Sequence, residues 1–121
     1  PKIRTIGLRA EKMMFDSTNN VNTHKGIIFL FGISLFTVSK ILSENIPFTD
    51  LEFQNTVKKI GEGLVKNELN HLADPKTHGE KVFQKYGIEG AGIRYEIENG
   101  LFTIFQTAVP YFSKNLNSEV Y

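Results

Sequence analysis

The feature that most constrains this chain is an uncharged, strongly apolar stretch over residues 26–39. Wound into a helix, it would be apolar on nearly every side, which is typical of a helix in a protein core. It is shorter than the roughly 20 apolar residues that span a bilayer. We therefore predict a central core helix that begins at Thr23 as its N-cap and ends at about Ser43. Residues 27–31 alone would suit a strand, but the length of the segment favours a helix.

Helical patterns also dominate the rest of the N-terminal half. Apolar residues at three- and four-residue spacing predict a helix over residues 3–14. The adjacent residues Asn19 and Asn20 indicate a turn after it, because asparagine tolerates left-handed backbone. Thr49 and Glu52 form a capping box that opens a third helix, whose buried stripe is expected to consist of Phe53, Val57, Ile60 and Leu64.

Glycine and proline punctuate the C-terminal half. We expect a loop over residues 70–76, then a helix that opens with a capping box at Thr77 and Glu80, runs through Tyr86 and is capped by Gly87.

A last helix should run from about Tyr95 or Leu101 to Val109, where Pro110 limits it. Residues 113–121 are polar and are expected to form a connector. The whole chain, residues 1–121, is predicted to be a single all-α bundle of about five helices.

Composition excludes several classes of protein. The 121 residues suffice for one domain, and the net charge of +1 gives no general attraction for nucleic acid or an anionic membrane. The absence of cysteine excludes disulfides, thiolate metal sites and cysteine nucleophiles. The sequence shows no signal-peptide pattern, so we expect a soluble, cytoplasmic protein whose start lies upstream of Pro1.

The densest polar cluster precedes the apolar helix, and it consists of Asn22, Thr23, His24, Lys25 and Gly26. The first N–H groups of a helix lack intrahelical partners and attract anions, phosphates above all. The lysine adds a mobile charge, the glycine lets a ligand approach the backbone, and the histidine can give up a proton near neutral pH. A capped helix start with solvated side chains explains the same pattern equally well, since every helix has an N-terminus.

Two other pairs of charged residues allow the same two interpretations. Arg9 and Glu11 flank the apolar stripe of the first helix and do not face each other. Charges at the edge of the core are the simpler interpretation, although the position of this pair before residues 22–26 allows a shared site. Arg94 and Glu96 follow a glycine cluster, where arginine suits phosphate and glutamate suits a base or a metal, but a charged helix start is the simpler interpretation.

Histidines 71 and 78 flank Asp74, but their spacing matches no standard metal site. From the residues alone, no metal ligand is assigned.

Four strings together resemble the triphosphoribosyl-dephospho-CoA synthase family. They are G-L-R-A-E-K-M-M at residues 7–14, T-N-N-V-N-T-H-K-G-I-I-F at 18–29, G-I-R-Y-E at 92–96 with Gly100 after it, and A-V-P at 108–110. The family carries G-x-R-x-E-x-x-M, T-x-G-V-N-T-H-K-G-x-I-F, R-G-E-x-x-x-G and L-P in this order and at this spacing.

The chain departs from the family pattern at three positions and in length. Asn20 and Tyr95 stand where the family usually has glycine, and Phe102 stands where it has proline. Family members are more than twice as long, with a P-K-P-G-L-V-D and a G-x-H-x-D-M-D element upstream and D-x-N-x-x-x-R-G-G downstream. The resemblance therefore implies an internal fragment of a larger all-α enzyme.

The resemblance implies a transferase that joins ATP to 3′-dephospho-CoA and releases adenine. A ribose hydroxyl of dephospho-CoA attacks C1′ of the ATP ribose, and Mg²⁺ accompanies the triphosphate. The product is the precursor of the prosthetic group of the acyl carriers of citrate lyase or malonate decarboxylase.

By the same resemblance, the residues of the three polar segments receive roles. Lys25 and the backbone around Asn22, Thr23 and Gly26 would hold phosphate, and Arg9 and Arg94 would clamp the triphosphate or the CoA diphosphate. His24 would donate to adenine or to a phosphate oxygen, and Glu11 or Glu96 would serve as base or metal partner.

Two other kinds of function stay open at this point. One is a helical nucleotide-binding or interaction module without catalysis, and the other, disfavoured by the charge, is a DNA-binding domain. A piece of a larger bundle would expose apolar faces, so we also consider self-association.

Overall fold

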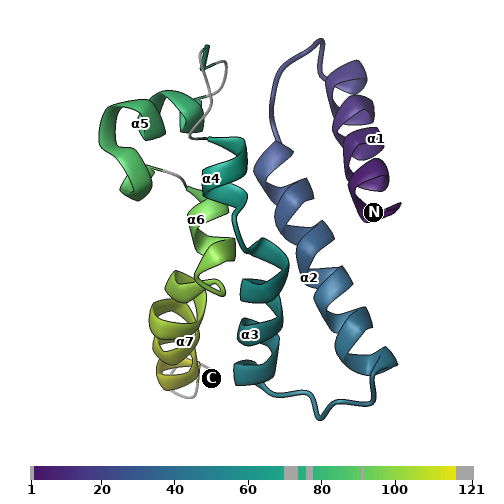
Figure 1. Cartoon of the computed structure of the whole chain (residues 1–121), viewed down its shortest axis with the longest axis vertical. Coiled ribbons are helices and arrows are strands. Elements are labelled where there is room, and N and C mark those ends of the chain that lie inside the picture. Colours follow the sequence, from purple (N-terminus) through teal and green to yellow (C-terminus); the bar gives the residue numbers. More distant parts are fainter. Residues whose placement is uncertain (1, 70–73, 76–77, 91, 117–121) are drawn as a thin grey trace. The chain divides into compact units, whose positions relative to one another are not determined.

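The computed structural model describes residues 2–69, 74–75, 78–90 and 92–116. These residues form helices and connecting turns and contain no β-strand, so the predicted all-α class is confirmed (Figure 1). The chain divides into two compact units, Pro1–Pro47 and Phe48–Tyr121, and each is described by itself. The prediction that residues 1–121 are a fragment of one larger domain stays a prediction.

The first unit is a pair of antiparallel helices, α1 (Lys2–Ser17) and α2 (Lys25–Ser43), which pack on each other (Figure 1). Asn19 and Asn20 have φ angles of 51° and 64°, so the predicted left-handed turn between these helices is confirmed. The apolar stripe predicted for α1 is correct only in part, because Ile6 and Met13 are exposed. The half-buried positions of α1 are spaced three or four residues apart, and they include Ile3, Gly7, Ala10, Glu11 and Met14.

The start of α2 differs from the prediction by one residue. His24, not Thr23, occupies the N-cap position, and its side chain makes no capping hydrogen bond. The first intrahelical bond runs from the Ile28 N–H to the His24 carbonyl oxygen (2.9 Å). Asn22, two positions before the N-cap, caps the helix instead, because its Oδ1 accepts a hydrogen bond from the Lys25 N–H (3.2 Å).

The prediction that α2 is buried on nearly all sides holds for only part of its surface. Thr37 and Ile41 are fully buried, whereas Ile27, Phe31 and Leu35 are more than half exposed. Among the described helices α2 alone is long and apolar enough to cross a bilayer. That criterion considers length and composition only, and the core helix of a soluble protein also meets it.

The second unit begins with α3 (Asp50–Gly61), whose start agrees with the sequence pattern. Thr49 is the N-cap, and its Oγ1 accepts a hydrogen bond from the Glu52 N–H (3.1 Å). Phe48 and Phe53 contact each other across this start with ring centroids 6.1 Å apart, and so form a hydrophobic staple.

The predicted single helix from Thr49 to Leu64 is interrupted. The first helix ends at Gly61, and α4 (Leu64–Glu68) begins after Gly63, whose φ of +78° is left-handed and breaks the hydrogen-bond ladder. Gly61 lies directly against Ile97, because a Cβ built at Gly61 would be 2.5 Å from the Ile97 Cγ2. The absence of a side chain at Gly61 therefore lets α3 pack closely against Ile97.

The partner of α3 and α4 is α6 (Ile93–Glu98), which contacts both. Before it, α5 (His78–Tyr86) ends where predicted, because Gly87 has a φ of +68° and opens the short 3₁₀ helix η1 (Gly87–Gly90). The capping residue predicted at Thr77, and all but Asp74 and Pro75 of the loop predicted over residues 70–76, lie outside the described residues.

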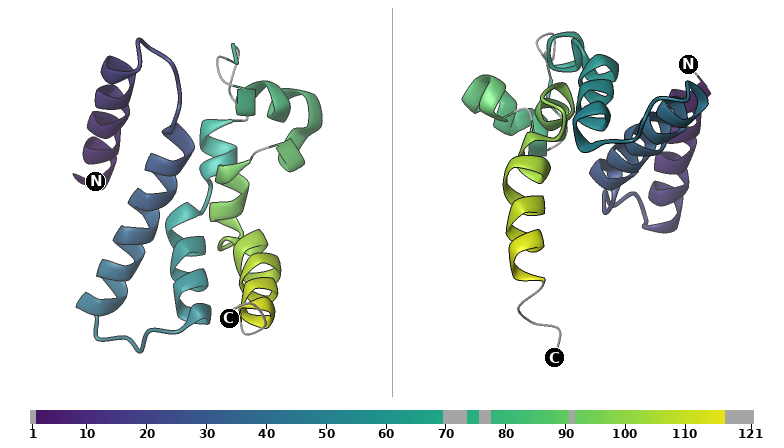
Figure 2. Two further views of the ribbon diagram at one scale, coloured as in Figure 1. Left: turned by 180° about the vertical axis from the view of Figure 1, so that it is seen from behind. Right: turned by 90° about the horizontal axis from the view of Figure 1, so that it is seen from below.

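The prediction that Pro110 ends the last helix is wrong. A π-helical turn, η2 (Ile104–Ala108), leads directly into α7 (Val109–Asn115), and Figure 2 shows the two as one continuous segment. The Val109 N–H donates five residues back to Ile104, and Pro110 falls in the first turn of α7, where its missing N–H costs little. The connector expected from residue 113 is therefore helical as far as Asn115, and residues 117–121 lie outside the described residues.

Candidate functional site

The turn between α1 and α2 is held by bonds to the last turn of α1. The Thr18 hydroxyl lies 2.8 Å from the carbonyl oxygen of Met14 and 2.6 Å from that of Val21. The Asn20 N–H donates to the Phe15 carbonyl oxygen (2.9 Å). The His24 N–H is 3.1 Å from the Met14 sulfur, so the N-cap of α2 is fixed against α1. This network places the polar cluster 22–26 next to the C-terminal half of α1.

The side chains of this cluster remain accessible. Asn22, Thr23 and His24 are exposed, and the Thr23 Oγ1 lies 2.7 Å from the His24 Nδ1. The other ring nitrogen of His24 faces no partner among the described residues. Above Gly26 the space is open, because a Cβ built there would meet no atom within 4 Å. A ligand can thus reach the start of α2, as the sequence predicts for a phosphate site.

One ion pair joins the first helix to this cluster. The Lys25 Nζ lies 3.5 Å from the Glu11 Oε2, with 37% of the lysine and 18% of the glutamate side chain exposed. The sequence did not predict this contact, since the two residues belong to different helices. Arg9 is exposed and makes no ion pair with any described residue, so the structure brings Glu11, but not Arg9, together with Lys25.

In the second unit, Arg94 and Glu96 both lie on α6 but face different partners. The Arg94 Nε donates to the Glu68 Oε2 on α4 (3.0 Å), with both side chains about one quarter exposed. The carboxylate of Glu96 accepts two hydrogen bonds from Thr103, from its N–H at 3.0 Å and its hydroxyl at 2.5 Å. Both side chains therefore have partners within the second unit.

The sequence pattern did not indicate the partners that these contacts involve, namely Glu68, Glu98 and Thr103. The Glu98 Oε1 accepts a hydrogen bond from the Val65 N–H (2.9 Å) and so caps the start of α4 from a different helix. Such partners lie up to 33 positions apart in the chain, and no local spacing rule identifies them. Only the contact between Glu96 and Thr103 could have been suggested by local sequence, because Thr103 lies seven positions after Glu96 at the start of the next helical segment.

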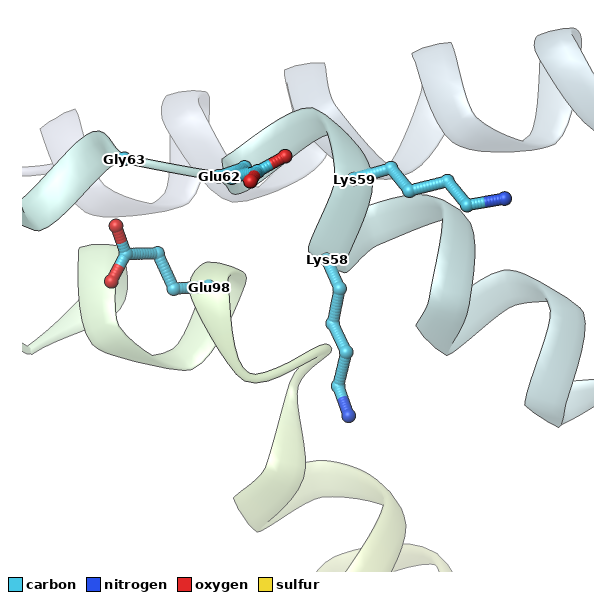
Figure 3. Close-up of a pocket in the computed structure, with 5 residues that line it drawn as sticks. All are labelled: Lys58, Lys59, Glu62, Gly63 and Glu98. Atoms are coloured by element: carbon cyan, nitrogen blue, oxygen red, sulfur yellow. The ribbon is translucent and has the colours of Figure 1, made fainter.

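A shallow hollow of about 400 Å³ lies on the second unit, lined by Lys58, Lys59, Glu62, Gly63 and Glu98. Figure 3 shows that the two ammonium groups point away from each other and from the Glu98 carboxylate. The hollow therefore offers no converging set of charges for a ligand.

Within the described residues, no group of three or more histidine, cysteine, aspartate or glutamate side chains could hold a metal ion. Of the histidines considered for a metal site, His78 opens α5, whereas His71 lies outside the described residues.

The described residues thus form a helical protein in which a polar cluster, residues 22–26, lies accessible at the start of α2. Residues 2–120 match the family described as ATP:dephospho-CoA triphosphoribosyl transferase, and the chain belongs to this family. The resemblance seen in the strings at residues 7–14, 18–29, 92–96 and 108–110 is confirmed.

Curated relatives agree with this membership. The chain is 38% identical to a protein of Photobacterium profundum named probable 2-(5''-triphosphoribosyl)-3'-dephosphocoenzyme-A synthase, over 96% of the chain and 37% of that protein. It is 39% identical to Protein CitXG of Haemophilus influenzae, over 93% of the chain and 25% of that protein. A protein of Streptococcus mutans that has the same name as the Photobacterium protein is 32% identical, over 95% of the chain and 42% of that protein.

The chain thus spans between one quarter and about two fifths of the length of these relatives. No solved structure matches it.

Proposed function

We propose that the protein to which this chain contributes transfers the triphosphoribosyl group of ATP to 3′-dephospho-CoA and releases adenine. A ribose hydroxyl oxygen of dephospho-CoA forms a bond to C1′ of the ATP ribose. The bond from C1′ to the adenine nitrogen breaks, and its electron pair leaves with adenine. The hydroxyl loses a proton to a base and adenine gains one from an acid, so the reaction needs no other co-reactant.

The observation that carries this proposal is the contact between Glu11 and Lys25. Each residue comes from a different one of the two N-terminal strings by which the chain resembles the family, and their charged atoms are 3.5 Å apart at an accessible helix start. A cation, a helix start and a carboxylate in one place are what a phosphate-bearing substrate and a departing proton require. The membership of residues 2–120 in the transferase family supports the same reaction.

The proposed roles follow from this placement. Lys25 and the backbone around Asn22, Thr23 and Gly26 hold the phosphates, because the start of α2 is open there. His24 donates a proton to adenine or a hydrogen bond to a phosphate oxygen, since one of its ring nitrogens has no partner among the described residues.

Charge builds up on the ribose ring as adenine leaves, as in glycoside hydrolysis, so a carboxylate is needed as base. Glu11 and Glu96 are the two candidates for base or metal partner. Arg9 and Arg94 are the candidates for a clamp on the triphosphate or the CoA diphosphate, and of these Arg94 is paired with Glu68, whereas Arg9 has no ion-pair partner in the described part of the chain.

Mg²⁺ enters the proposal with ATP. At nucleotide sites this ion is commonly held by phosphate oxygens, water and one or two carboxylates. The described residues form no cluster of three metal-ligating side chains, and no protein ligand is assigned.

The product would be the precursor of the prosthetic group on the acyl carrier of citrate lyase or malonate decarboxylase. We propose that the reaction takes place in the cytoplasm, where ATP and dephospho-CoA are available, without a nucleic-acid or membrane partner. Self-association of the 121-residue chain is a further proposal, supported by the exposed apolar residues Ile27, Phe31 and Leu35.

The test uses the protein encoded by the complete gene, with the 121-residue chain alongside. Each is incubated with ATP, Mg²⁺ and 3′-dephospho-CoA, and free adenine is measured by chromatography. We expect adenine from the complete protein, and release by the 121-residue chain as well would mean that its own residues suffice. ATP binding without adenine release by either one would favour the alternative, a helical nucleotide-binding module without catalysis.

A further inference from the structure

The contacts of the two candidate carboxylates distinguish their roles. We infer that Glu11 takes the hydroxyl proton, that Lys25 holds Glu11 until the triphosphate draws the lysine away, and that Glu96 only positions the helical segment after α6. This inference rests on the proposed function and identifies the residue that performs one of its steps.

Glu96 is poorly placed to act as a base because both of its oxygens are occupied. One oxygen accepts from the Thr103 N–H at 3.0 Å and the other from the Thr103 hydroxyl at 2.5 Å. Thr103 lies at the start of a helical segment, where N–H groups lack intrahelical partners and a carboxylate is a favourable cap. Protonation of Glu96 would weaken this cap, so its chemistry is tied to the fold.

Glu11 is held much less firmly. Its ion pair with Lys25 has a length of 3.5 Å, whereas a strong charge-assisted hydrogen bond measures about 2.7–2.9 Å. Lysine carries its charge on a flexible four-carbon stem and has three N–H donors that can turn to another anion. The triphosphate, with several negative charges, would compete with a single carboxylate for this ammonium group.

The exchange links substrate binding to proton transfer. When Lys25 moves onto the triphosphate, a Glu11 oxygen is released beside the start of α2, where the substrates are proposed to bind. The dephospho-CoA hydroxyl then gives its proton to this oxygen as its own oxygen bonds to C1′. His24 supplies the proton that adenine gains, and solvent later restores both residues.

The inference predicts opposite effects of one substitution on ATP binding and on turnover. Glu11→Gln removes both the base and the competitor for Lys25. When this substitution is made in the protein encoded by the complete gene, we expect the variant to bind MgATP about two- to fivefold more tightly by calorimetry. This change in affinity corresponds to the free energy of a partly exposed ion pair. We expect the substitution to lower kcat for adenine release by about 100-fold or more, as loss of a general base does.

Three further variants serve as controls. Asp16→Asn removes another ion pair of α1, with Lys12 at 2.7 Å, and should leave ATP binding and kcat as in the wild type. Glu96→Gln should act mainly on the fold, and we expect it to lower the melting temperature, as Thr103→Val should also do. Its loss of kcat should be at least about tenfold smaller than that of Glu11→Gln.

Different results overturn the inference and the proposed function. A larger loss of kcat in Glu96→Gln than in Glu11→Gln overturns the assignment of the base. Unchanged or weaker ATP binding in Glu11→Gln overturns the exchange of Lys25, and this binding test stands even where no adenine is released. A wild-type protein that binds MgATP but releases no adenine overturns the proposed reaction.

Discussion

Replacing Gly61 by alanine tests the packing of the second unit, because two effects of opposite sign meet at this residue. An added Cβ would lie 2.5 Å from the Ile97 Cγ2 and 3.1 Å from the Ile97 carbonyl carbon and oxygen. Ile97 is fully buried and two of these atoms belong to the backbone, so the clash cannot be relieved by a side-chain rotation. Overpacking of this kind costs about 1–3 kcal/mol.

The opposing effect is smaller. Alanine is favoured over glycine in a helix interior by at most about 1 kcal/mol, and Gly61 is the last residue of α3, where the gain is less. The net expectation is a loss of about 1–2 kcal/mol in the free energy of unfolding. For a chain of this size that corresponds to a melting temperature lower by about 4–8 °C.

The assay is thermal unfolding of the 121-residue chain, followed by circular dichroism in the far ultraviolet. Gly7→Ala in α1 is the matched control, because a Cβ at Gly7 would meet no atom within 4 Å. The control should gain about 0.5–1 kcal/mol from helix propensity alone. A melting temperature that rises in Gly61→Ala as it does in the control would refute the close contact between α3 and α6.

Three further predictions concern helix capping and the phosphate site. Thr49→Ala should lower the free energy of unfolding by about 1 kcal/mol in urea titrations because the N-cap of α3 is lost. Thr49→Ser keeps a capping hydroxyl and should retain most of the wild-type stability. Glu98→Ala leaves the Val65 N–H without its acceptor and should cost about 1.5–3 kcal/mol; no change would mean that this cap does not form in solution. Lys25→Ala should raise the KM for ATP by about tenfold or more, whereas the control Lys12→Ala should leave this KM unchanged. Equal rates of Lys25→Ala and the wild type at limiting ATP would show that Lys25 does not belong to the site.

The sequence predicts those parts of the fold that depend on neighbouring residues. Thr49 caps α3 with the geometry that its spacing to Glu52 indicates, and Asn19 and Asn20 form the left-handed turn. Each is a local effect, in which nearby residues satisfy backbone groups or adopt a backbone conformation that suits them. Gly87 ends α5 for the same kind of reason.

Errors occurred where a neighbouring segment changed the local preference. Thr23 has a good capping side chain, but Asn22 caps the first turn of α2 while the Thr23 hydroxyl lies against His24. Proline normally limits a helix, yet Pro110 follows a π-helical turn and lies in the first turn of α7, where no backbone N–H is needed. A left-handed Gly63 divides a helix whose apolar stripe appears continuous in the sequence.

The sequence predicted which residues belong to the candidate site, but it did not predict which of them contact each other. The string at residues 22–26 identified an accessible helix start, and the structure agrees with that prediction. The pairing of Lys25 with Glu11, and that of Arg94 with Glu68, depends on how helices pack and has no signature in local spacing. For this reason the sequence left Glu11 and Glu96 as equal candidates, and only their partners separate them.

The most direct test of the proposed transfer follows two labels of ATP in a single reaction. ATP labelled in both the adenine ring and the γ-phosphate is incubated with Mg²⁺, 3′-dephospho-CoA and the protein encoded by the complete gene. We predict that the phosphate label moves with the CoA product while the adenine label appears as free adenine. Both labels remaining on ATP, or a phosphate label released as inorganic phosphate, would contradict the proposed transfer.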